Sequence, residues 1–424
     1  MKKNLLFIVI DGCGDIRSEK FGNKTPLEDD NLTSLNFLAK KGVTGIVHVT
    51  PGIAPESNSA VLSLLGYPTE IHGGRGPLEA VGTGVNFKDG MLGLRSNFAT
   101  AEGKNVIDRR VGRSLTSKEA AELAKSVNRQ VKLSKGGFIF KPSLAHRAVL
   151  IFKAKQRLSA NISNTDPAYR MREGIAEALK EFPKTVMESQ PLEKGAELSA
   201  ELLNEFTKKS YELLDSHPIN KKRAKEGKLK ANVILSRDAG NELPKLYNIS
   251  KKYGKKWAIL ADMPLEMGIG KLCGMESVKL TLPTYTKKDY PERVSKTLSA
   301  MKKYDCLYIH LKGPDLFAHD GDFEGKKKSI MDIDKYYFDP LLRKISLENT
   351  LILVTADHST PCINKSHSAD PVPIVIAGND LKPDNVEKFN EYDCSKGSLG
   401  ALKGLEIMPK VMSIFDMSEI VKNH

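Results

Sequence analysis

Three apolar, β-rich runs that each end in acidic side chains constrain the fold of this chain most strongly. They are LLFIVID, CLYIHLKGPD and TLILVTADH, which end at Asp11, at Asp315 and at Asp357 with His358. Uninterrupted apolar runs of this kind are typical of strands buried on both faces of a parallel sheet. Because open α/β sheets present functional groups at the carboxyl ends of their strands, we expect the three ends to form one site.

Helical patterns separate these runs, so the sequence predicts an α/β fold. Residues 291–304 precede the second run, and residues 329–345 lie between the second and the third. Strands that alternate with helices indicate βαβ units. We therefore expect a mostly parallel sheet flanked by helices.

The middle of the chain has a different pattern. A glycine-rich segment at 72–84 marks the point where the chain leaves the first domain. Beyond it, Thr116 and Glu119 have the spacing of a capping box, and residues 196–214 carry apolar side chains along one helical face. The first pattern returns at 255–262. We expect an α+β insertion domain at 70–250 within a discontinuous domain of residues 1–69 and 251–424.

The composition is that of a soluble globular protein. The 424 residues are 40% hydrophobic and 28% charged, and no apolar run approaches the roughly 20 residues of a membrane span. The apolar start of the chain is closed by Asp11 and lacks a small-residue cleavage site, so a buried strand is a better interpretation than a signal peptide. Five scattered cysteines suit reduced thiols and a cytoplasmic location.

The net charge of +13 favours an anionic partner. The basic residues do not form a motif that is interspersed with aromatic residues, so we expect no nucleic-acid partner. A small anionic substrate is the better interpretation, and the oligomeric state stays open.

The strand ends carry enough oxygen and nitrogen donors for two metal ions. Asp315 and His319 are four residues apart, so on a helical turn both would face the same ion. Asp357 and His358 are adjacent and point to opposite sides if the chain is extended there.

Each donor taken alone has an ordinary explanation. Asp11 could cap the next helix, and His367 could be a surface histidine. Several such donors in one predicted site favour a metal centre, and their chemistry suits manganese, magnesium or zinc.

A serine pair precedes an apolar helical run in the segment TPGIAPESNSAVLSLLGY. Ser57 and Ser59 are both at positions where serine is ordinarily a helix N-cap. A hydroxyl at a helix N-terminus is also well placed as a nucleophile. The residues alone give capping and catalysis similar weight.

Several longer strings together resemble one enzyme family. They are VIDGCGD, PESNSAVLSLLGY, GGRGPLEAVGTGV, RSNFAT, DRRVGR, KGPDLFAHDGD, DHSTPC and HSADPVP. The chain resembles, nearly from end to end, the archaeal type of cofactor-independent (2,3-bisphosphoglycerate-independent) phosphoglycerate mutase of the alkaline phosphatase superfamily. The resemblance implies an isomerase of glycolysis and gluconeogenesis that interconverts 3-phosphoglycerate and 2-phosphoglycerate. It also implies two divalent metal ions (manganese, zinc or magnesium), a phosphoserine intermediate and no need for 2,3-bisphosphoglycerate.

The family's site residues carry over onto matching positions of this chain. One ion would be held by Asp315, His319 and His367. The other would be held by Asp11, Asp357, His358 and the nucleophile Ser57.

The substrate would be clamped by the insertion domain, which we expect to close over the site and exclude water. Guanidinium groups bind carboxylate and phosphate bidentately, so arginines of this domain are the candidates. The predicted substrate-binding residues are Arg75, Asp108, Arg109, Arg110, Arg113 and Lys271. Arg95, Arg147 and Arg237 are less specific candidates.

The chain departs from the family pattern beside the nucleophile. Glu56 and Asn58 flank Ser57 where the family usually has Gly and Asp, and Met267 stands where it tends to have a lysine. Two alternatives therefore stay open. One is a metal-dependent phosphomonoesterase or phosphonate hydrolase of the same superfamily, and the other is a weakened paralogue that binds phosphorylated metabolites.

Overall fold

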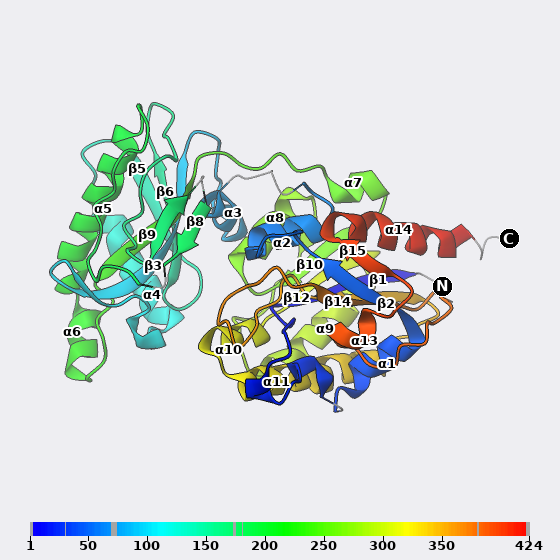
Figure 1. Ribbon diagram of the computed structural model, residues 1–424. Helices are drawn as coiled ribbons and strands as arrows, with labels where there is room; N and C mark the ends of the chain where they lie inside the picture. Colours follow the sequence, from blue (N-terminus) through cyan, green and yellow to red (C-terminus); the bar gives the residue numbers. More distant parts are fainter. Residues whose placement is uncertain are drawn as a thin grey trace. The chain divides into compact units, whose positions relative to one another are not determined.

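The computed structural model describes residues 3–29, 31–68, 74–172, 175–179, 181–379 and 381–420. The chain divides into two compact units (Figure 1). Unit 1 comprises Met1–Ile71 and Leu246–His424, and unit 2 comprises His72–Lys245. The first predicted domain boundary, between residues 69 and 70, lies outside the described residues. The roles given to the two domains remain predictions.

Unit 1 is built on an eight-stranded sheet, and the predicted mostly parallel α/β fold is confirmed. Strand β14 runs antiparallel to both of its neighbours, while the other described ladders are parallel. The spatial order is β11 (Glu276–Ser277), β10 (Trp257–Ala261), β12 (Cys306–Leu311), β1 (Asn4–Ile10), β13 (Thr350–Thr355), β14 (Val372–Ala377), β2 (Gly42–His48) and β15 (Gly400–Lys403).

The centre of this sheet is buried on both faces. Every residue of β1, β12 and β13 is buried, as their uninterrupted apolar sequences predict. Helices cover both faces (Figure 1). One face carries α1 (Thr33–Lys41), α9 (Tyr290–Met301) and α11 (Phe323–Ile333), and the other carries α2 (Ser57–Leu64), α8 (Pro264–Leu272) and α14 (Gly404–Ile420). Shorter helices are α7 (Ile249–Tyr253), α10 (Pro314–Asp320), α12 (Asp339–Leu342) and α13 (Glu391–Cys394).

The helix predicted at 329–345 differs from the structure. Helix α11 begins at Phe323, and a π-helical turn over Asp334–Phe338 separates it from α12. The carboxylate of Asp334 accepts hydrogen bonds from the backbone N–H groups of Ser34 and Leu35 in the first turn of α1. The Asp334 side chain, at the start of the π-helical turn, thus satisfies two backbone N–H groups of α1 that have no partner within their own helix.

Unit 2 contains an antiparallel sheet packed against helices. Its strands are β3 (Leu92–Glu102), β4 (Asn105–Asp108), β5 (Gly137–Pro142), β6 (Arg147–Lys153) and β9 (Val233–Gly240), and a separate hairpin is formed by β7 (Tyr169–Arg172) and β8 (Ile175–Ala178). The helices are α3 (Arg75–Gly82), α4 (Ser117–Gln130), α5 (Glu197–Asp215) and α6 (Pro218–Lys225). The capping box predicted for Thr116 and Glu119 is present at the start of α4. None of the helices in the described parts of the chain has the length and apolar character that a membrane span needs.

Candidate metal centre

The central strands of unit 1 bring the predicted donors together. Asp11 directly follows β1, and β1 pairs in parallel with β12 on one side and β13 on the other. Asp357 and His358 lie just beyond β13, and α10, which carries Asp315, follows β12. Neighbouring parallel strands end at the same edge of a sheet, so these donors meet there.

The donors form two overlapping groups that could each hold one ion. The Asp11 cluster contains Asp11, Asp357 and His358, and the Asp315 cluster contains Asp315, His358 and His367. Within each cluster the candidate ligand atoms lie within 4.8 Å of one another. His358 Nε2 is 3.3 Å from Asp357 Oδ2 and 3.7 Å from Asp11 Oδ1, and His367 Nε2 is 3.5 Å from Asp315 Oδ1.

Two buried atoms of the Asp11 cluster indicate that the site suits a cation. Asp357 Oδ2 and His358 Nε2 have no hydrogen-bond partner among the described residues. Leaving a buried carboxylate oxygen and an imidazole nitrogen unsatisfied is costly, whereas a divalent ion would use both lone pairs. The donors of both clusters are oxygen and nitrogen atoms, which suits manganese, magnesium or zinc.

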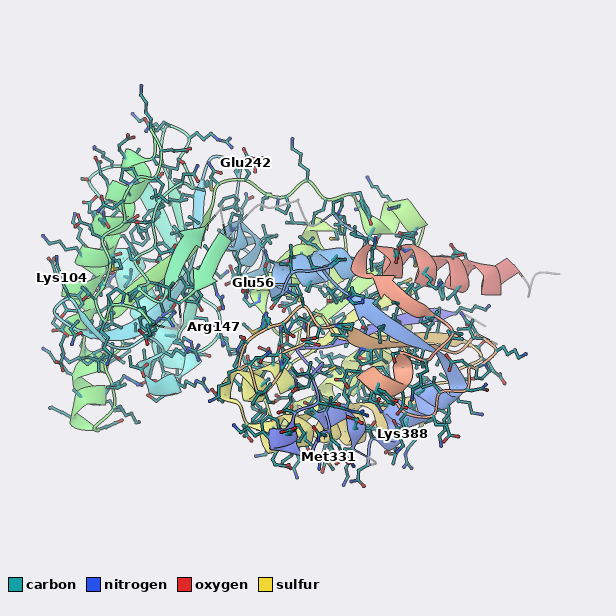
Figure 2. The ribbon with its side chains drawn as sticks, in the orientation of Figure 1. Glu56, Lys104, Arg147, Glu242, Met331 and Lys388 are labelled. Carbon is teal, nitrogen blue, oxygen red and sulfur yellow. The ribbon has the colours of Figure 1, made fainter. Side chains whose placement is uncertain are left out.

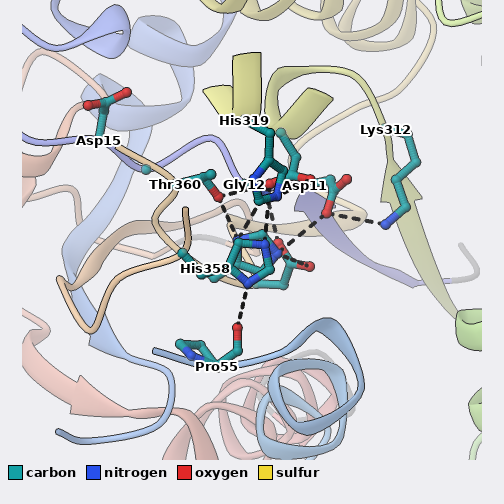
Figure 3. A network of polar contacts seen from close by, with 12 residues as sticks. Asp11, Gly12, Asp15, Pro55, Lys312, His319, His358 and Thr360 are labelled. Carbon is teal, nitrogen blue, oxygen red and sulfur yellow. Dashed lines mark hydrogen bonds and ion pairs between the residues drawn. The ribbon is translucent and has the colours of Figure 1, made fainter. Parts of the chain in front are cut away.

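A hydrogen-bonded chain determines which nitrogen of His358 faces the acids (Figure 3). Thr360 Oγ1 donates to Asp315 Oδ1 at 2.9 Å and lies 2.9 Å from His358 Nδ1. A hydroxyl has one proton, so His358 Nδ1–H must be the donor in the second contact. Burial and the positive charge of His367 hold the pKa of His358 well below its usual value. The imidazole is therefore neutral, and its Nε2 is a bare ligand nitrogen.

Burial and neighbouring charges shift the pKa values of the acids and of His367 in the site. Burial and the negative charge of Asp11 raise the pKa of Asp357 to about 7. Burial acts to raise the pKa of Asp11 as well, but the positive charge of Lys312 holds it below its usual range. Although burial opposes protonation of His367, the hydrogen bond to Asp315 raises its pKa to about 9. An ion that binds here must displace such protons.

His319 lies at the edge of this site. Its Nε2 is 3.4 Å from Asp315 Oδ2, as the four-residue spacing on a helix predicts. Its Nδ1 contacts the carbonyl oxygen of Lys365 at 3.1 Å, and its side chain is 43% exposed. The structure thus groups His358, rather than His319, most closely with Asp315 and His367.

Ser57 is the first residue of α2, and Glu56, not a serine, holds the N-cap position (Figure 2). Ser59 Oγ donates to the carbonyl oxygen of Glu56 at 2.9 Å, so its hydroxyl is used within the helix start. The carbonyl oxygen of Pro55 accepts a hydrogen bond from His367 Nδ1 at 2.8 Å. This bond ties the start of α2 to the Asp315 cluster, which places Ser57 two residues from a direct contact with that cluster.

Sequence reasoning missed Lys312 and Glu266. Lys312 Nζ lies 2.7 Å from Glu266 Oε1 and 3.2 Å from Asp11 Oδ1. Burial acts to lower the pKa of Lys312, but the two carboxylates raise it. Lys312 follows β12 at the level where Asp11 follows β1, because Ile10 pairs with Leu311. Only the register between β1 and β12, which the local sequence does not show, would have predicted that Lys312 lies beside Asp11. The predicted Lys271 is instead exposed in the last turn of α8.

Unit 2 gathers several arginines around two buried acids. Arg109 Nε and Nη2 donate to Asp166 at 2.8 and 2.6 Å, and Arg237 Nη1 donates to the same carboxylate at 2.9 Å. Arg75 and Arg95 both contact Glu79, at 3.1 and 3.3 Å. Arg95 and Arg237 are among the less specific candidates of the sequence. The sequence did not indicate Asp166, because nothing in its neighbourhood predicts that this side chain is buried.

The remaining candidates are Asp108, the last residue of β4, and Arg110 and Arg113, which follow it. Asp108 Oδ1 accepts hydrogen bonds from the backbone N–H groups of Arg110 and Gly112, at 2.7 and 2.8 Å. Val111, Gly112 and Arg113 all have positive φ, of 55°, 58° and 55°. Positive φ is strained for a β-branched valine, and such strain is concentrated at functional sites. The side chains of Arg110 and Arg113 are exposed.

A family model and relatives of known sequence carry the same description. A family model described as 2,3-bisphosphoglycerate-independent phosphoglycerate mutase matches residues 39–220. The enzyme of that name from Aeropyrum pernix is 42% identical over 97% of this chain and 99% of its own length. The one from Methanopyrus kandleri is 36% identical over 99% and 98%.

Two solved structures are similar over nearly their whole length. A protein from Pyrococcus horikoshii superposes with a TM-score of 0.77 at 27% identity and covers 98% of each chain. A cofactor-independent phosphoglycerate mutase from Thermoplasma acidophilum superposes with a TM-score of 0.61 at 28% identity, over 97% of this chain and all of its own. By sequence and by fold, the chain belongs to the 2,3-bisphosphoglycerate-independent phosphoglycerate mutases.

Proposed function

We propose that this protein interconverts 3-phosphoglycerate and 2-phosphoglycerate, a step of glycolysis and gluconeogenesis, through a phosphoserine at Ser57. The observation that carries the proposal is the meeting of the Asp11 and Asp315 clusters next to the start of α2. Two donor groups that share His358 suit a pair of ions, and Ser57 is the hydroxyl at the adjacent helix N-terminus.

The proposed ligands are the members of both clusters together with Ser57 and His319. One ion would be held by Asp11, Asp357, His358 and Ser57, and the other by Asp315, His319 and His367. Such ions, when bound, lower the pKa of a nearby hydroxyl and neutralise charge on a transferring phosphoryl group. Manganese, zinc and magnesium are the candidates.

The residues of the chain would carry out a two-step transfer. Ser57 Oγ forms a bond to phosphorus while the bond from phosphorus to the glycerate oxygen breaks, and the proton of Ser57 ends on that oxygen. The second hydroxyl of the retained glycerate then takes the phosphoryl group and returns a proton to Ser57. The backbone N–H groups at the start of α2 favour the negative charge of the phosphoserine.

Retention of glycerate separates a mutase from a phosphatase. We assign this role to guanidinium groups of unit 2, because they bind carboxylate and phosphate bidentately. Arg110 and Arg113 are exposed and lie just after β4, where three successive residues have positive φ. These two arginines are our first choice among the candidates, and the hydrogen bonds of Asp108 hold this segment in place.

The test compares Ser57→Ala with Ser59→Ala after reconstitution with Mn²⁺. Formation of 2-phosphoglycerate, release of free phosphate and the mass of the phosphoenzyme are followed together. We expect Ser57→Ala to abolish isomerisation and the phosphoenzyme while it still binds metal, and Ser59→Ala to stay active. Phosphate release without isomerisation by the unmodified protein, or isomerisation by Ser57→Ala, would overturn the proposal.

A further inference from the structure

A buried lysine on α11 uses its whole hydrogen-bonding capacity. The side chain of Lys326 is 0% exposed, and its Nζ donates to Gly14 O at 2.7 Å, Asp15 Oδ2 at 2.9 Å and Thr360 O at 2.9 Å. An ammonium group has three N–H donors, so each of them is satisfied. Lysine is almost never fully buried unless it is paired, and this one is held by a buried carboxylate.

The acceptors of Lys326 belong to the two loops that carry the Asp11 cluster. Gly14 and Asp15 follow Asp11 in the loop after β1, and Thr360 follows His358 in the loop after β13. The loops also contact each other directly, because Thr360 N–H donates to Gly14 O at 3.0 Å. Asp15 Oδ2 accepts a second hydrogen bond, at 3.2 Å, from the backbone N–H of Cys362. One ammonium and one carboxylate thus join both loops.

The packing between these loops leaves no space for adjustment. A Cβ atom at Gly14 would lie 2.3 Å from Ser359 Oγ. A Cβ atom at Gly12 would lie 2.7 Å from Asp315 Cβ and 2.9 Å from Thr360 Oγ1. The backbone of the Asp11 loop is therefore in close contact with the segments that carry the other proposed ligands, and a small separation would change the distance between Asp11 and His358.

We propose that Lys326 is a positioning residue that sets the spacing between Asp11 and His358 and thereby the affinity for metal. It lies behind the ligands and contacts no reacting atom. The inference rests on the proposed metal centre. Without the ammonium, the buried Asp15 carboxylate and two carbonyl oxygens lose their shared partner, and only the direct hydrogen bonds from Thr360 N–H and Cys362 N–H still join the loops. Such groups behind the ligands typically change metal affinity by about 10–100-fold.

The test measures Mn²⁺ dissociation constants by calorimetry on metal-free protein. Lys326→Met removes the charge and keeps the length of the side chain. Lys328→Met is the matched control, because Lys328 lies on the same helix with a side chain that is 74% exposed. We expect Lys326→Met to weaken binding by about 10–100-fold, the control to leave it unchanged, and Lys326→Arg to restore part of the loss.

Melting temperatures in EDTA separate positioning from general stability. If Lys326→Met melts earlier in EDTA but binds Mn²⁺ as tightly as the unmodified protein, the inference is wrong. If that variant does not fold, Asp15→Asn takes its place, because it removes the countercharge and keeps the shape; an unchanged dissociation constant there overturns the inference. No Mn²⁺ binding by the unmodified protein would overturn the metal centre and this inference together.

Discussion

The hydroxyl of Thr360 donates a hydrogen bond to the Asp315 carboxylate at 2.9 Å and so links the two candidate ion sites. The same oxygen accepts from His358 Nδ1–H, which leaves His358 Nε2 bare and directed at the Asp11 cluster. Asp315 stays ionised: burial acts against it, but His319 and His367 hold its pKa well below the usual value. Thr360 thus fixes the orientation of His358, a proposed ligand of one ion, while it is hydrogen-bonded to Asp315, a proposed ligand of the other ion.

Removal of this hydroxyl is expected to weaken metal binding. Thr360→Val keeps the shape but lets His358 carry its proton on Nε2, so we expect Mn²⁺ to bind about 10–100-fold more weakly. Thr360→Ser keeps the hydroxyl and serves as the control, with affinity close to that of the unmodified protein. Calorimetric titration of both metal-free variants measures the difference, and equal affinities would show that the tautomer does not depend on Thr360.

Metal removal is expected to destabilise unit 1. In the Asp11 cluster, Asp357 Oδ2 and His358 Nε2 are buried without a hydrogen-bond partner in the described parts of the chain, so an ion bound there would relieve an unfavourable arrangement. A ligand at 100 times its dissociation constant stabilises a protein by about 3 kcal/mol. EDTA should therefore lower the melting temperature in differential scanning fluorimetry, and excess Mn²⁺ should restore it. A melting temperature indifferent to both additions would argue against the site.

The buried Asp166 carboxylate is expected to stabilise unit 2. Asp166→Asn removes the buried carboxylate that the Arg109 and Arg237 guanidinium groups share, and breaking such a buried ion pair typically costs about 3–5 kcal/mol. Hydrogen exchange of the β3 and β9 amides reports the local free energy of opening. Glu201→Gln breaks the exposed ion pair with Lys135 and should leave the same amides unchanged. Equal exchange in both variants would contradict the expected role of Asp166.

Glu391 is expected to make stability depend on pH. Its carboxylate accepts hydrogen bonds from Thr25 Oγ1 and the backbone N–H of Asp15, and burial raises its pKa from 4.5 to about 7. Between these values the folded state binds more protons than the unfolded state, so this group lowers the free energy of unfolding as pH rises from about 4.5 to about 7.

Glu391→Gln isolates this contribution because the amide keeps the size of the side chain. Its oxygen can still accept from Asp15 N–H, and the Thr25 hydroxyl can turn to accept from the amide nitrogen. Urea unfolding at pH 5 and pH 8 should show a loss on raising the pH that is larger in the unmodified protein, by about 1–3 kcal/mol, than in the variant. The same change with pH in both proteins would show that Glu391 titrates near its ordinary value.

Local patterns in the sequence predict the strands of unit 1 and the donors at their ends. The apolar runs before Asp11 and Asp357 form buried parallel strands, because residues of this kind avoid water wherever the strand lies. The four-residue spacing of Asp315 and His319 places them on one helix face for an equally local reason. These features depend on neighbours within one segment, so they can be inferred before any contact is known.

Contacts between distant segments depend on the register of paired strands and on which side chains become buried. Local sequence patterns reveal neither. Lys312 reaches Asp11 because β1 and β12 pair with Ile10 opposite Leu311. Thr360 and Lys326 acquire their roles because loops more than 300 residues apart pack without space between them. Only the family resemblance separates Ser57 from Ser59 in the sequence. In the structure the two hydroxyls differ physically, because the helix begins at Ser57 and the Ser59 hydroxyl donates to the carbonyl oxygen of Glu56.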